Sequence, residues 1–125
     1  MNKLNQAELL MRLGKDLNLF NSRLISLQIE YADGRLTATV RLHIDNVENA
    51  RLLTLIFNNV QEYSFSYSRN YSFYNVETYK LTVSEKEIFL SLDPADDSPH
   101  RVPDDQDYIS AEEVYGLLDI ANLLM

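Results

Sequence analysis

The sequence has 125 residues, of which 46% are hydrophobic and 24% charged, and it carries a net charge of −8. A chain of this length and composition is predicted to form one globular domain, residues 1–125, and the absence of cysteine excludes disulfides and thiolate metal sites. The negative charge argues against nucleic acid as a partner, because binding to phosphate backbones requires clustered lysine and arginine.

The first part of the chain predicts a helix followed by a β-hairpin. Residues 3–13 carry leucines on one side of a helical repeat, and Gly14 is suited to end the helix. Apolar and polar residues then alternate through 25–31 and 36–44, which is typical of strands with one buried face. The turn residues 32–34 between them indicate a hairpin.

Four further strands are predicted from alternating or continuous apolar residues: 51–57, 62–67, 73–83 and 88–92. The pair Asn58–Asn59 predicts a turn between the first two of these strands. Strand and helix both remain open for residues 108–116. The tail 117–124 predicts a terminal helix, because apolar residues recur there at helical spacing.

These elements predict an α+β fold. The expected architecture is a mostly antiparallel sheet of six to seven strands in meander order, with a short N-terminal helix and a short C-terminal helix. The chain has no apolar run of about 18 residues, and its first residues lack a secretory signal. We therefore expect a cytoplasmic protein that makes no membrane contact.

The charge is concentrated in one part of the chain, the acidic segment (residues 93–119). Nine acidic residues and a single basic residue, Arg101, lie there, and acids and bases balance in the rest of the chain. All three prolines also lie in it, so its first part is expected to be a loop outside the sheet. Such a segment is either a solvated loop or a surface for a protein partner. The candidate partner-binding residues are its acids and two tyrosines: Asp93, Asp96, Asp97, Asp104, Asp105, Asp107, Tyr108, Glu112, Glu113 and Tyr115.

The sequence offers little for catalysis. It has no GxSxG or HExxH motif, and its three glycines are too dispersed for a phosphate-binding loop. His43 is expected on the polar face of a strand, and His100 in the loop could pair with an acid. The acidic segment lacks the glycine-containing pattern of a calcium loop. We therefore assign no catalytic residue, no metal ligand and no cofactor.

A second concentration, of aromatic residues, lies in residues 63–79, where seven of the thirteen tyrosines and phenylalanines occur. Alternating aromatic residues pack across strands or line a core. Aromatic side chains that stay exposed would instead form a protein-contact surface, since tyrosine is enriched at interfaces.

Three runs of the chain, Leu19–Ile29, Leu53–Val60 and Ile88–Asp93, resemble a loose group of small bacterial proteins whose first strand begins with an "LHDS-x-L-x-x-I" segment. The similarity spans residues 19–115, with Asn21 where the group commonly has histidine. Several members are immunity proteins or neighbours of bacterial toxins. The resemblance implies an antiparallel sheet and a protein partner, and it carries over no catalytic residue.

The leading hypothesis is thus a non-enzymatic protein-binding module of the immunity type, with a basic toxin domain as the expected partner of the acidic surface. One alternative is a small-molecule-binding protein or enzyme with a pocket between sheet and helix. A third is a structural or assembly protein that forms a homodimer.

Overall fold

One antiparallel sheet of eight strands and one helix make up the part of the chain that the structure, a computed structural model, describes: residues 2–13, 15, 17–44, 51–70 and 74–120. The strands are β1 (Asn2–Leu4), β2 (Ser22–Ala32), β3 (Arg35–Ile44), β4 (Arg51–Ser64), β5 (Asn75–Val76), β6 (Lys80–Val83), β7 (Ile88–Asp93) and β8 (Gln106–Ile120), and the helix is α1 (Gln6–Leu13). The strand order is β5-β2-β3-β4-β8-β7-β6, with β1 paired to β8.

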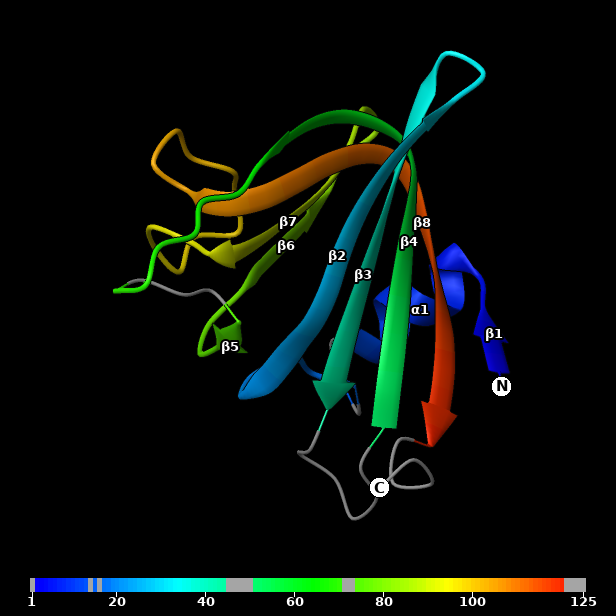
Figure 1. The fold of residues 1–125 in the computed structure, drawn as a ribbon, viewed down its shortest axis with the longest axis horizontal. Coiled ribbons are helices and arrows are strands. Elements are labelled where there is room, and N and C mark those ends of the chain that lie inside the picture. Colours follow the sequence, from blue (N-terminus) through cyan, green and yellow to red (C-terminus); the bar gives the residue numbers. More distant parts are fainter. Residues whose placement is uncertain (1, 14, 16, 45–50, 71–73, 121–125) are drawn as a thin grey trace.

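The sheet curls into a half-barrel because its two longest strands, β4 and β8, bend midway along their length (Figure 1). Asn59 has a positive φ of 56°, and the β4–β8 register shifts between Val60 and Glu62. A bulge of this kind bends a strand and increases its twist. The bend divides the sheet into two halves. The helix half contains α1, β1, β2, β3 and the adjoining parts of β4 and β8, and the loop half contains β6, β7 and the remaining parts of β4 and β8.

The helix α1 begins with a capping box and packs its apolar face against the sheet. The Asn5 side chain accepts a hydrogen bond from the Glu8 backbone N–H at 3.0 Å, and Glu8 accepts one from the Asn5 N–H at 3.4 Å. Leu9 and Leu13 are buried. A Cβ atom at Gly116 of β8 would lie only 3.1 Å from Leu9 Cδ1. A residue without a side chain at this position therefore lets the helix lie close against the sheet.

The core lies on the inner, concave face of the sheet. The predicted hairpin of β2 and β3 is confirmed, and alternate residues of β3, such as Val40 and Leu42, are buried as the sequence indicated. The alternation of β2 differs near its start, where the register shifts between Leu24 and Ser26. Because of this bulge Leu24 enters the core, and Ile25, predicted to be buried, is 52% exposed.

The predicted meander order is wrong. Strand β8 lies between β4 and β7, so the last strand of the chain is central in the sheet, and β5, β6 and β7 are not next to β4. The reason is that pairing between strands distant in sequence depends on tertiary packing, which local alternation does not encode.

The predicted C-terminal helix is also wrong for residues 117–120, which belong to β8, where Leu118 pairs with Leu53 of β4. The rest of that predicted helix, residues 121–124, lies outside the described residues. Apolar residues at consecutive positions are compatible both with a helix and with a strand that is covered on both faces. Residues 108–116, for which helix and strand were open, are strand.

Three smaller differences concern element boundaries. Residues 2–4 form β1, although residues 3 and 4 were assigned to the helix. The predicted turn Asn58–Asn59 is the bend within one continuous strand, β4. The predicted strand 73–83 is two short strands, β5 and β6, and its first residue lies outside the described part. Among the described residues, no helix is both long and apolar enough to cross a membrane.

Candidate functional site

The acidic loop (residues 94–105), which joins β7 to β8, packs against the outer face of the loop half. This face is the one opposite the core: Phe89 and Ser91 of β7 are fully buried there, while their neighbours Ile88 and Leu90 face the core. The predicted loop therefore forms a second layer on the sheet.

Asp105 holds the acidic loop together. It is 4% exposed, and its two carboxylate oxygens accept hydrogen bonds from the Lys80 ammonium group at 3.0 Å each. The backbone N–H groups of Ala95 and Val102 donate to the same carboxylate at 2.8 and 2.9 Å. Burial disfavours the charged carboxylate, but these donors outweigh it and lower the pKa of Asp105. The charge of Asp105 is thus compensated within the fold.

Lys80 of β6 is the matching cation, and it is 5% exposed. Besides Asp105, its ammonium group donates to the Asp96 carboxylate at 2.7 Å and to the His100 carbonyl at 2.8 Å. Burial disfavours the charged amine, yet hydrogen bonds to Asp96 and Asp105 outweigh it and raise the pKa of Lys80. One lysine therefore joins the start, the middle and the end of the acidic loop.

Arg101 fixes the middle of the loop over two aromatic rings. Its guanidinium carbon lies 4.7 Å from the centroid of the Phe89 ring and 4.9 Å from that of Tyr108. It also forms ion pairs with Glu62 of β4 at 2.5 Å and with Glu87 at 3.0 Å. Hydrogen bonds from Arg101 and from the Tyr108 hydroxyl lower the pKa of Glu62. Arg101, the single basic residue of the acidic segment, is thus paired with acids from outside the segment.

The candidate residues divide into three groups by position. Asp96, Asp105 and Tyr108 make the contacts just described, and buried Asp107 accepts a hydrogen bond from the Ser66 N–H at 2.9 Å. Asp93 is half-buried at the end of β7. Besides Asp96, four candidates are exposed: Asp97, Asp104, Glu112 and Glu113.

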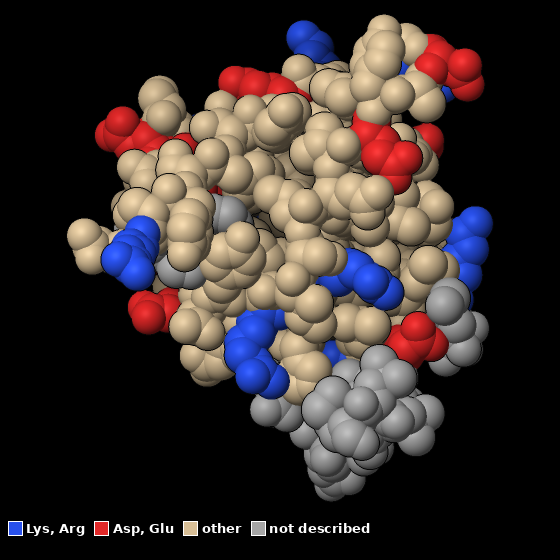
Figure 2. Space-filling model, viewed as in Figure 1, with Lys and Arg blue, Asp and Glu red and all other residues tan. Residues whose placement is uncertain are grey.

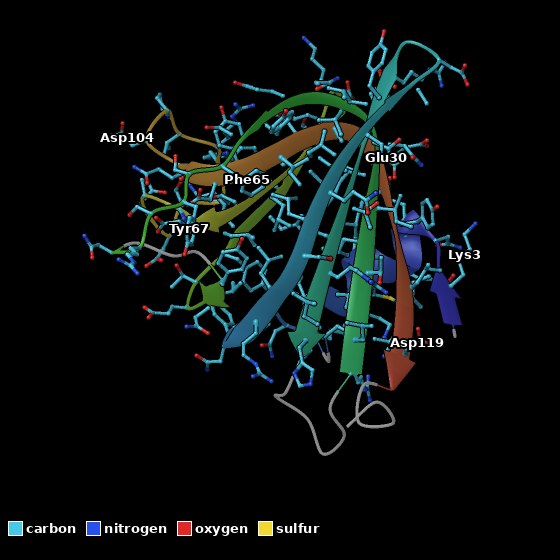
Figure 3. All side chains as sticks on the ribbon, in the orientation of Figure 1. Lys3, Glu30, Phe65, Tyr67, Asp104 and Asp119 are labelled. Atoms are coloured by element: carbon cyan, nitrogen blue, oxygen red, sulfur yellow. The ribbon has the colours of Figure 1, made fainter. Side chains whose placement is uncertain are left out.

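Two of these four exposed acids belong to the acidic loop itself. Asp97 and Asp104 lie in the loop, whereas Glu112 and Glu113 lie on β8 near the bend, where Glu113 is opposite Asn58. Figure 3 shows Asp104 and the hairpin residue Glu30 far apart in the view. Tyr115 lies in the helix half, half-buried, with the Lys3 ammonium group 4.8 Å from its ring centroid.

The buried polar side chains of the described residues are hydrogen-bonded within the fold. Within the described ranges, no group of three His, Asp or Glu side chains could hold a metal ion. The His100 ring is exposed, and the residue contributes its carbonyl oxygen to the Lys80 cluster. Each buried side-chain polar atom of the described residues has a hydrogen-bond partner. The arrangement therefore stabilises one loop conformation.

Sequence reasoning missed the partners of the loop: Lys80, Glu62, Glu87 and Phe89. Lys80 lies inside a predicted strand on its polar side, and nothing in the local pattern separates it from an exposed lysine. Arg101 gave the available signal, because a single base among nine acids is expected to form ion pairs. Its partners Glu62 and Glu87 lie outside the acidic segment, so their identity required the fold.

The aromatic stretch has members of both expected kinds. Phe65 and Tyr79 are partly buried against the core, while Tyr63 and Tyr67 are 45% and 67% exposed. Tyr71 and Phe73 lie outside the described residues.

No family model, no curated protein and no solved structure matches the chain.

Proposed function

We propose that this protein is a non-enzymatic binding module that presents the acidic loop to a basic protein partner. The observation that carries the proposal is that the loop is fixed at several points while Asp97 and Asp104 remain exposed on it. A loop already held in its bound shape loses less conformational entropy on association than a mobile one.

The pattern of charge compensation also favours a basic partner. Lys80 and Arg101 each pair with two carboxylates, so these two cations and four acids together carry a net negative charge. Negative charge on one surface speeds association with a positively charged protein and selects against acidic ones. Within this proposal, the partner is a basic toxin domain that the protein neutralises, as an immunity protein does.

The exposed acids of the loop are the residues to test. Replacement of Asp97 and Asp104 by asparagine removes two negative charges and leaves the Lys80 and Arg101 contacts in place. We expect this variant to associate about three- to tenfold more slowly at low salt with a basic partner recovered from the native host, and the difference should shrink as salt rises. Stopped-flow or surface-plasmon measurements of the association rate constant check this result.

A matched control removes the same charge elsewhere. Glu30 and Asp33 lie in the β2–β3 hairpin and are exposed. The variant with Glu30→Gln and Asp33→Asn should associate at nearly the rate of the unmodified protein. Equal rates for all three proteins, or the same slowing in both variants, would show that the acidic loop is not the contact surface.

A further inference from the structure

We infer that the open edge of β2 pairs with the same edge of a second copy of this chain, around Gln28, to form a dimer with a continuous sheet. This inference concerns a surface other than the acidic loop and is independent of the proposed function. It starts from the backbone groups that β2 leaves available.

Among the described residues, β5 and Tyr74 contact the edge of β2 at its beginning. Strand β5 pairs with Ser22 and Arg23, and the Leu24 N–H donates to the Tyr74 carbonyl at 2.7 Å. Beyond this point no described strand pairs with β2 on that side, and Figure 1 shows β2 at the front of the view with its hairpin projecting past the sheet. The pairing of β3 with β4 begins only at Ala38, so the outer part of the hairpin has two strands. Unpaired N–H and C=O groups along such an edge are a template for another strand.

The usual protection of an edge strand is weak here. Residues 24–29 contain no charged residue and no proline, the two features that most often prevent pairing at an edge. Figure 2 shows the molecule in the same view, with Lys and Arg side chains near the centre of the face and below it among mostly uncharged residues. In an antiparallel pair centred on Gln28, the one charged residue within 26–30 is Glu30, which would lie opposite the uncharged Ser26 of the second copy.

The sequence of the edge is complementary to itself. Residues 26–30 read polar, apolar, polar, apolar, polar, which is the same pattern in both directions from Gln28. In an antiparallel pair centred on Gln28, Leu27 of one copy would lie opposite Ile29 of the second copy. Both side chains are partly buried and pack against the core, so this pairing would cover their remaining exposed surface. Two-fold symmetry of this kind is the commonest in protein oligomers, and it makes a second copy the occupant that fits.

A single cysteine at the symmetry axis tests the register directly, because the chain has no cysteine of its own. In the proposed dimer the two residues at position 28 face each other across the strand pair, within the Cα separation that a disulfide needs. We expect Gln28→Cys to form a covalent dimer under mild oxidation. Glu30→Cys is the matched control on the same side of the same strand. Its two copies would lie about 13 Å apart, which is too far for a disulfide.

Sedimentation equilibrium from micromolar to millimolar concentrations measures the association without a cross-link. We expect a monomer–dimer equilibrium, and in Gln28→Lys an increase of the dissociation constant by about fivefold, because two like charges would lie directly opposite each other. A protein that stays monomeric throughout this range would overturn the inference. So would equal rates of cross-linking for Gln28→Cys and Glu30→Cys.

Discussion

The two halves of the sheet are each covered by a second layer, but by opposite means. In the helix half, α1 covers the inner face with leucines, and Leu9 lies against Gly116. In the loop half, the acidic loop covers the outer face, and Lys80 and Arg101 hold it through four ion pairs. Apolar burial changes little with pH or salt, whereas ion pairs depend on both. We therefore expect the two layers of this protein to respond differently to changes in pH and in salt concentration.

The largest expected effect is in the helix half. Phe57 of β4 is 1% exposed, and Phe57→Ala should lower the free energy of unfolding by about 3–5 kcal/mol, because it leaves a cavity in the apolar core. Urea denaturation at low and high salt should give the same loss. A loss that depends strongly on salt would mean that the two halves are not held by different forces.

The next effect is in the loop half. Asp105→Asn removes the charge that Lys80 and two backbone N–H groups contact, and we expect a loss of about 2–4 kcal/mol at pH 7. Because the pKa of Asp105 is lowered in the folded state, its contribution is present above about pH 4 and is lost as pH falls through the folded pKa.

The pH dependence separates this loss from a packing defect. The difference in unfolding free energy between the unmodified protein and Asp105→Asn should therefore become smaller as pH is lowered from 7 toward 3. Phe57→Ala serves as the control, since its difference should stay constant over the same range. If the Asp105→Asn difference also stays constant, the carboxylate charge does not hold the loop.

The smallest effect is expected at the partly exposed Arg101. Arg101→Lys keeps the charge but loses the planar group that lies over Phe89 and Tyr108 and reaches two carboxylates. We expect a loss of about 0.5–1 kcal/mol, and faster amide hydrogen exchange within residues 94–105. Arg41→Lys, an exposed position on β3, should change neither quantity. If amide hydrogen exchange in residues 94–105 is unchanged in Arg101→Lys, then Lys80 alone holds the loop in place.

The parts of the fold also differ in how well the sequence predicts them. The strands of the helix half alternate clearly, as in Leu36 to Ile44, and the hairpin of β2 and β3 follows from local turn chemistry. The place of β8 could not be predicted, because residues such as Leu117 and Leu118 are apolar on consecutive positions and fit a helix or a central strand.

The candidate site was predictable only in outline. The concentration of acids and prolines predicted a loop, and the structure has one at residues 94–105. The roles of individual acids depend on partners distant in sequence: Asp105 is buried because Lys80, 25 positions away, lies beneath it. Composition shows that such charges exist, and only the fold shows which of them are compensated.

The central position of β8 has a consequence for how the chain folds. This strand pairs with β1, β4 and β7, so the beginning, the middle and the end of the chain must come together before the sheet exists. The pairings of β8 with β1 and with β4 each close a long loop, whose entropic cost precedes the energy gained by packing. We therefore expect slow folding, on the millisecond-to-second scale of proteins dominated by non-local strand pairing, with the β2–β3 hairpin as an early local structure.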